Sequence, residues 1–302
     1  MNSMDNHTKG YLYMVISTLL ISIAFIFNTF ALRGTNPTTG AFFVFGFSTI
    51  GTFAMLVATK KIGKIKQLMP RFWKPLLLIG VLNGVSATLW FYLLGLMGPS
   101  LLSFLLRFST IFMIIMGIVF LKERFSKLEI VGGLIMIAGT FIISYSNGEL
   151  ILFGVSLAMI LSAVFSAVQF LNKVYIKEID PLVINALRVL FTFATVSTIA
   201  LWTSQLAVPP LATLGWLALS SISAGMIGFL LNFKALQLID LSKTAVIQSM
   251  QPFVVVLYSI LLLGSVPSSL QMFGGIVIVV GTIVSVLARY KPKFIARFIP
   301  FD

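Results

Sequence analysis

Apolar runs long enough to cross a lipid bilayer recur along the whole of this 302-residue sequence. A bilayer core about 30 Å thick requires roughly 20 apolar residues in a helix. Only 10% of the residues are charged, whereas a soluble domain carries about 25%. The sequence therefore predicts an all-α integral membrane protein with ten transmembrane helices, at residues 10–32, 38–58, 75–97, 99–121, 128–146, 149–171, 181–203, 212–233, 242–264 and 269–288.

The positions of Lys and Arg predict how these helices are oriented. With the N-terminus in the cytoplasm, 18 of the 21 Lys and Arg residues fall in cytoplasmic regions. The external loops contain only Arg33, and the remaining two, Arg107 and Arg188, fall within helices. Cytoplasmic loops of membrane proteins are enriched in Lys and Arg. We therefore expect both termini to be cytoplasmic and the protein to lie in the cell (inner) membrane. The net charge of +13 could indicate a nucleic-acid partner, but most of these cations lie in short loops between apolar runs, so we expect no such partner.

A short glycine pattern occurs twice, 142 residues apart. Residues 132–140 read GGLIMIAGT, and residues 274–282 read GGIVIVVGT. Because residues seven apart lie on one face of a helix, Gly132 falls beside Gly139, and Gly274 beside Gly281. Small residues let helix backbones approach closely in lipid. The four glycines are therefore predicted to form a helix-packing seam.

Other residues recur at almost the same separation. Asn28 and Pro37 return as Asn172 and Pro181, 144 residues later. We interpret the chain as two five-helix repeats, residues 1–147 and residues 148–302. Because five is an odd number, the second repeat enters the membrane from the opposite side, which gives the inverted repeats that many secondary transporters use.

Three segments resemble motifs of the EamA-type members of the drug/metabolite transporter superfamily. They are residues 120–145, FLKERFSKLEIVGGLIMIAGTFIISY, residues 180–191, DPLVINALRVLF, and residues 251–253, QPF. The resemblance covers essentially the whole chain and implies export of amino acids or related metabolites. It also implies a structural or gating role for Arg188. The first repeat departs from this pattern, with Val44 at the position of Arg188, and the second repeat lacks the pair formed by Glu123 and Arg124.

The residues available for chemistry exclude several classes of function. The chain has no cysteine, and its single histidine, His7, lies in the N-terminal tail. All eight Asp and Glu residues fall at helix ends, in loops or in tails, so a membrane-embedded enzyme lacks its acid–base groups. We expect no enzyme activity, no cofactor and no metal. Many proton- and sodium-coupled carriers use an intramembrane carboxylate, and its absence favours uncoupled transport or coupling through the charge of the substrate.

Arg107 is the first candidate for binding a substrate. It is predicted to lie about 12 Å inside the outer end of the fourth helix, where a lone arginine costs at least about 2.5–3.5 kcal/mol on insertion scales. Two interpretations are open. Arg107 either faces a water-filled cavity and pairs with an anionic group of the substrate, or it bonds backbone carbonyls or extends to the interface.

The spacing of polar residues favours the cavity. Ser103, Arg107 and Thr110 share one helix face, and three residues on the ninth helix have the same spacing, namely Thr244, Gln248 and Gln251. Interhelical hydrogen bonding is the alternative explanation of such stripes. We favour cavity lining, because the two stripes are related by the repeat. Pro252 removes a backbone hydrogen bond, so it is predicted to kink the ninth helix and free a carbonyl near the site.

Further polar residues on other helices complete the predicted site. Asn83 and Trp90 lie on one face of the third helix together with Ser86, and Asn232 is the counterpart of Trp90 in the second repeat. Gln169 belongs to a similar stripe on the sixth helix. Trp90 either stacks on a substrate or packs in the core.

These residues predict a secondary transporter, an exporter or a uniporter, of amino acids or other carboxylate-bearing solutes. Alternating access would move the two repeats about a central cavity. A transporter of multiple drugs or lipid-linked substrates is the alternative within this class, and a membrane scaffold or accessory subunit is the alternative outside it. The expected partners are the solute and the lipid bilayer, and the chain is expected to be monomeric.

Overall fold

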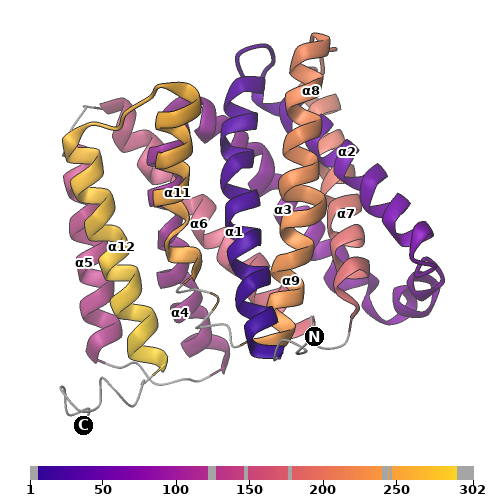
Figure 1. Ribbon diagram of the computed structural model, residues 1–302, viewed down its shortest axis with the longest axis horizontal. Coiled ribbons are helices and arrows are strands. Elements are labelled where there is room, and N and C mark those ends of the chain that lie inside the picture. The colour runs from indigo at the N-terminus through magenta and orange to yellow at the C-terminus, as the bar shows by residue number, and fades with distance from the viewer. Residues whose placement is uncertain are drawn as a thin grey trace, which may run out of the picture.

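The computed structural model describes residues 6–121, 127–145, 149–175, 179–239, 244 and 247–290, and all the regular secondary structure within them is helical. Six helical stretches are long and apolar enough to cross a membrane, and three shorter apolar helices accompany them. The start of α1 and the end of α12 lie at the same end of the bundle (Figure 1). Glu123 and Arg124, which take part in the family resemblance, lie outside the described residues.

Most helix boundaries fall within a few residues of the predicted spans. In chain order the elements are α1 (Asn6–Ala31), α2 (Pro37–Ala58), α3 (Gly63–Leu105), the 3₁₀ turn η1 (Leu106–Phe108), α4 (Ser109–Leu121), α5 (Lys127–Tyr145), α6 (Glu149–Tyr175), α7 (Pro181–Trp202), α8 (Leu211–Ser220), the π-helical η2 (Ser221–Gly228), α9 (Phe229–Leu238), α11 (Gln251–Tyr258), the π-helical η3 (Ser259–Leu263) and α12 (Ser269–Tyr290).

The third helix begins before its predicted start, and its helical path breaks at its predicted end. α3 begins at Gly63, so Pro75 lies inside it and does not mark its first turn. The predicted start was wrong because it relied on a continuous apolar run, whereas residues 63–74 are helical although they carry several Lys and Arg residues. At the other end, Gly98 has a φ of 76° and a ψ of 169°, which breaks the helical path directly before Pro99.

Large apolar side chains cover the outside of the bundle. Phe141 in α5 is 72% exposed, and Ile50 in α2 is 70% exposed. Contiguous apolar surfaces of this kind are rare on soluble monomers. Their presence on long helices fits a protein surrounded by lipid.

The predicted glycine seam joins α5 to α12. These two helices lie side by side at one edge of the bundle (Figure 1). Gly132 faces Gly281, and Gly139 faces Gly274, so closely that a Cβ added to any of the four would lie 2.6–2.8 Å from the carbonyl oxygen of its partner. The first glycine of each repeat thus meets the second glycine of the other repeat, which is the reciprocal contact that a two-fold axis generates.

The other contacts between the halves are also reciprocal. α1 packs on α8 and α9, and its counterpart α6 packs on α3. α2 packs on α8 and η2, and its counterpart α7 packs on α3. α1 also packs on α11, while α6 packs on α4. Each of these helices therefore packs on the elements of the opposite half that correspond to those its counterpart contacts.

Alanine at Gly139 is expected to destabilise the protein by about 1–3 kcal/mol, the usual cost of overpacking. The added Cβ would meet the backbone of α12, which cannot move aside as a flexible side chain would. Gly133→Ala is the matched control, because the nearest atom to its Cβ is Ile111 Cδ1 at 4.0 Å. Thermal unfolding in detergent should show a lower midpoint for Gly139→Ala alone. Equal midpoints for the two variants would contradict the seam.

Candidate functional site

A cavity of about 200 Å³ lies between the two halves of the bundle. Residues of α1, α2, α3, α4, α6, α7, α8, η1, η2, α9 and α11 contribute to its wall. The polar and tryptophan residues of the wall are Asn28, Ser48, Asn83, Ser86, Trp90, Arg107, Ser109, Thr110, Ser166, Gln169, Arg188, Ser220, Asn232, Gln248 and Gln251. A site between two repeats is typical of transporters.

Arg107 reaches the cavity from η1 and is held by the opposite repeat. Its Nη1 donates to the backbone carbonyl of Gln248 at 2.8 Å, and its Nη2 donates to Oε1 of Gln251 at 3.0 Å. No hydrogen-bond partner is found for its Nε among the residues that the structure describes. The arrangement thus has one feature of each interpretation of Arg107: the guanidinium donates to a backbone carbonyl, and it also lines the cavity.

Pro252 explains why a carbonyl is available to Arg107. A proline has no N–H, so the carbonyl four residues earlier in a helix loses its partner. That carbonyl belongs to Gln248, and it accepts the hydrogen bond from Arg107. The helical pattern is interrupted at Met250, directly before α11 begins at Gln251. The interruption turns the polar end of Gln251 toward the same guanidinium.

Arg188 lines the same cavity, which the sequence did not predict. It is 2% exposed, and its Nη2 donates to Oδ1 of Asn185 at 2.9 Å. Its guanidinium carbon lies 4.2 Å from the ring centre of Phe229, a cation–π contact. Asn185 in turn donates to the carbonyl of Gly225 in η2 at 3.0 Å. The wide turns of a π-helix frequently occur at functional sites.

Five other predicted residues also lie on the cavity wall. Asn83 donates to Thr192 Oγ1 at 2.9 Å, so it links α3 to α7. Trp90 makes edge-to-face contacts with Phe25 and Phe91, with ring centres 4.9 Å and 5.2 Å apart. The remaining three predicted residues on the wall are Thr110, Gln169 and Asn232.

Two predicted residues are not part of the wall. Ser103 is buried, and its Oγ donates to the carbonyl of Ser100 at 2.6 Å. The 3₁₀ turn η1 lies between Ser103 and Thr110, and its three residues per turn move Ser103 off the face that Arg107 occupies. Thr244 is also buried, and it precedes the interruption at Met250.

Three further wall residues have a buried oxygen for which no hydrogen-bond partner is found among the described residues. These atoms are Asn28 Oδ1, Ser86 Oγ and Ser220 Oγ. Asn28 carried a sequence signal, since it recurs as Asn172, and Ser86 lies on the same helix face as Asn83. Ser220 carried no signal, because its place depends on η2 beginning at the next residue.

The cavity wall carries positive charge only. Arg107 and Arg188 both contribute to it, and no Asp or Glu is among its described residues. A buried charge without a counter-ion is costly in a medium of low dielectric constant. Within the described residues, no group of three or more Asp, Glu or His could hold a metal ion. The wall is therefore suited to an anion.

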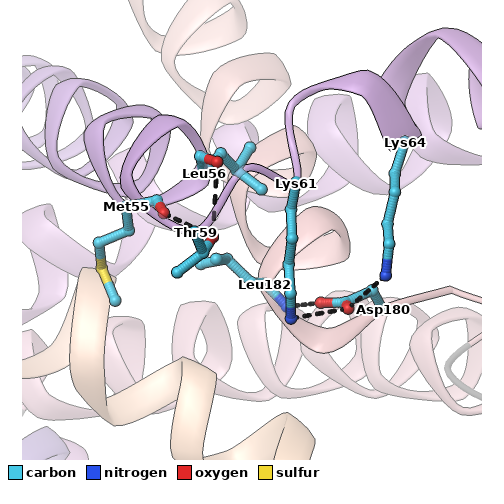
Figure 2. A network of polar contacts seen from close by, with 7 residues as sticks. All are labelled: Met55, Leu56, Thr59, Lys61, Lys64, Asp180 and Leu182. Carbon is cyan, nitrogen blue, oxygen red and sulfur yellow. Dashed lines mark hydrogen bonds and ion pairs between the residues drawn. The ribbon is translucent and has the colours of Figure 1, made fainter.

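An ionic latch, formed by Lys61, Lys64 and Asp180, joins the two halves at the end of the bundle where α1 starts. Figure 2 shows both lysines reaching Oδ2 of Asp180, at 2.9 Å and 3.1 Å. Asp180 also caps α7, since its Oδ1 accepts from the N–H of Leu182. Partial burial alone would raise the pKa of Asp180. The hydrogen bonds from the two lysines and from Leu182 outweigh burial and hold its pKa below the ordinary value.

A neutral latch, formed by Asn36, Thr38, Thr39 and Gln205, joins the halves at the opposite end. Thr39 Oγ1 donates to the backbone carbonyl of Gln205 at 2.8 Å, and Thr38 Oγ1 donates to its Oε1 at 2.7 Å. Asn36 caps α2 and donates to the same backbone carbonyl at 2.7 Å. Asn36 and Asp180 are 144 residues apart, as are Lys61 and Gln205. The two latches are thus counterparts, one charged and one neutral.

The substitution Asp180→Asn is expected to destabilise the protein by about 0.2–1 kcal/mol at pH 7, the usual range for exposed ion pairs. Asparagine is also a good N-cap, so the substitution removes the charge and retains the cap. Because folding lowers the pKa of Asp180, its stabilisation is present above the ordinary Asp pKa of about 3.9 and is lost as the pH falls through the lower folded value.

The free energy of unfolding of the natural protein and of Asp180→Asn, measured at pH 7, 5 and 3, tests this dependence on pH. The difference between them should persist from pH 7 to pH 5, shrink toward pH 3, and shrink in 1 M salt. Lys66→Gln is the control, since Lys66 lies near the latch, is exposed and forms no ion pair within the described residues. A difference that grows on acidification contradicts the assignment.

Comparisons with known proteins agree with this architecture. One solved protein structure, described only as "Crystal structure of protein", matches with a TM-score of 0.66 and 17% identity, over 94% of this chain and 98% of that chain. That likeness concerns the fold. No curated protein matches the sequence. The model of the EamA-like transporter family matches twice, at residues 8–145 and 152–287, once in each half. With nearly its whole length matched by two copies of that model, the chain belongs to the EamA-like transporter family.

Proposed function

We propose that this protein is a secondary transporter of small carboxylate-bearing metabolites, amino acids among them, and that it acts as an exporter or a uniporter. The observation that carries the proposal is the cavity between the repeats, whose wall holds two arginines and no described carboxylate. A carboxylate is the group that a buried guanidinium binds best, through charge-assisted hydrogen bonds. A hydrophobic cation, the typical multidrug substrate, would meet repulsion from both arginines.

We propose further that the chain crosses the cell (inner) membrane ten times, as two inverted repeats of residues 1–147 and 148–302 with cytoplasmic termini. The break at Gly98 supports two crossings between Gly63 and Leu121. α8, η2 and α9 form one apolar stretch, Leu211–Leu238, that is long enough for one crossing. We assign a further crossing to the shorter apolar stretch Ile247–Leu263. The reciprocal contacts of the two halves and the bias of Lys and Arg support the inversion.

The two latches suggest how access to the cavity alternates. Each latch joins one repeat to the other, at opposite ends of the cavity. When one repeat rocks against the other, one latch opens while the other remains closed, so the solute reaches only one side at a time. Every acidic residue lies at the end of a predicted span or outside the spans, and none lies at mid-membrane, so we expect transport to follow the solute gradient, or the membrane potential where the solute is charged.

A competition measurement on purified protein tests the proposed substrate class. We expect amino acids and other small carboxylates to raise the thermal unfolding midpoint in detergent, because a ligand that binds the folded state stabilises it. Their amides and quaternary ammonium compounds should have much smaller effects. A larger shift with the cations than with the carboxylates would overturn the proposal in favour of a multidrug transporter.

A further inference from the structure

Arg188 has hydrogen-bonding capacity that its protein neighbours do not use. A guanidinium has five N–H donors, and the only hydrogen bond found for the guanidinium of Arg188 within the described residues goes to Asn185. Its Nε has no partner, although the side chain is only 2% exposed. A purely structural arginine in a buried site would be expected to have its donors satisfied. The unused donors lie on a residue that lines the cavity.

Arg188 and Arg107 belong to different repeats and are not counterparts. The position equivalent to Arg188 in the first repeat is Val44, which also lies on the cavity wall. Arg107 is fixed by Gln248 and Gln251, whereas Arg188 is fixed by Asn185 and Phe229. The cavity therefore has two separate cationic points, each held by its own neighbours.

One monocarboxylate would leave one of these two charges without a counter-ion. No described wall residue can supply the second negative charge, and a buried charge that lacks a partner is strongly unfavourable. A solute with two carboxylates supplies both charges. The cavity, at about 200 Å³, is smaller than the roughly 300–1,000 Å³ of sites for drug-sized ligands, so the solute must be short.

The unpartnered oxygens add a second requirement. Asn28 Oδ1 is an acceptor, and the hydroxyls of Ser86 and Ser220 can accept as well as donate. All three residues are at least 96% buried and lie on the same wall. Carboxylates carry no donors, so they satisfy the two serines at most. A hydroxyl or an ammonium group on the solute would supply the donor that Asn28 needs.

We propose that the solute is a short dicarboxylate that carries a hydroxyl or an ammonium group, with one carboxylate bound by Arg107 and the other by Arg188. This inference rests on the proposed function and specifies its substrate. Arg188 is then a binding residue, and Val44 leaves room on the wall where a third arginine would otherwise stand.

Calorimetric titration of the full chain in detergent tests this with matched ligands. Aspartate and asparagine have nearly the same shape and differ in one carboxylate. We expect aspartate to bind at least about 10-fold more tightly, the effect of one charge-assisted hydrogen bond. Malate and succinate differ in one hydroxyl, and malate should bind about 2- to 10-fold more tightly.

Substitution of Arg188 separates a binding role from a structural one. Arg188→Gln should weaken aspartate binding to the level of asparagine and leave the affinity for asparagine unchanged, whereas loss of structure would weaken both. Arg188→Lys keeps the charge without the planar fork, so it should retain a reduced preference for aspartate. It also supplies the comparison if Arg188→Gln does not fold. Arg33→Gln, at an exposed arginine, is the control.

The outcomes separate this inference from the proposed function. Equal binding of aspartate and asparagine to the natural protein, with both dependent on Arg107, overturns the dicarboxylate and leaves a carboxylate transporter. Equal binding of malate and succinate overturns the role of the donor group. Failure of every carboxylate to bind overturns both proposals.

Discussion

Replacement of Arg107 by glutamine is expected to weaken binding of a carboxylate-bearing solute by about 10- to 150-fold, the range for loss of a hydrogen bond to a charged group. Glutamine can still hydrogen-bond to Gln251, but it carries no charge. The carbonyl of Gln248, which Pro252 deprives of its helical partner, would also lose the donor that Arg107 supplies. Calorimetric titration of both proteins measures the change.

Two controls accompany this prediction. Arg33→Gln removes an exposed arginine that contacts only Phe30 among the described contacts, and it should leave the affinity unchanged. The thermal unfolding midpoint of Arg107→Gln without ligand shows whether the variant remains folded. Affinity retained within about 2-fold in a folded Arg107→Gln protein would remove Arg107 from the binding site, since even a neutral hydrogen bond contributes about that much.

Chemical locking of either latch is expected to reduce transport to the background of protein-free liposomes. The natural chain has no cysteine, so two introduced cysteines are the only thiols. Thr39→Cys with Gln205→Cys places them where Thr39 Oγ1 now contacts the backbone of Gln205. Lys61→Cys with Asp180→Cys needs a bis-maleimide linker, because the long lysine side chain spans that gap. Transport should cease because the repeats can no longer rock apart at the locked end.

Binding should survive where transport does not. With one latch locked, the solute still enters from the other end, so titration should give an affinity close to that of the unlocked protein. Each single-cysteine variant treated with the same reagent should transport normally, and reduction of the disulfide should restore transport. Undiminished transport in a fully cross-linked sample is the contrary outcome, and it would exclude both latches from the transport cycle.

Some features of the structure follow from local sequence. The seam between α5 and α12 follows from seven-residue glycine spacing, and the structure places all four glycines against backbone carbonyls. The seventh predicted span begins at residue 181, as α7 does, and the structure shows Asp180 as its capping residue with Pro181 in the first turn. The freed carbonyl of Gln248 follows from Pro252 alone. In each case one or two residues determine the backbone geometry.

Features that depend on distant parts of the chain were not predicted. Arg188 enters the cavity because Asn185 is anchored to Gly225 in η2 and because Phe229 supports its guanidinium. A π-helical stretch such as η2 has no clear signal in composition or periodicity. Ser103 left the predicted face because a 3₁₀ turn follows it. The latches join residues well over 100 positions apart, and only the packing of the repeats reveals them.

Solute counterflow in liposomes tests the central claim most directly. Liposomes containing the purified protein are loaded with unlabelled aspartate and diluted into a trace of labelled aspartate. We expect the label to accumulate transiently inside the liposomes, and this accumulation should depend on Arg107. Unlabelled carboxylates in the outer solution should inhibit the accumulation, whereas quaternary ammonium compounds should not. Accumulation that survives Arg107→Gln, or that only the cations inhibit, would contradict a carboxylate transporter built around this cavity.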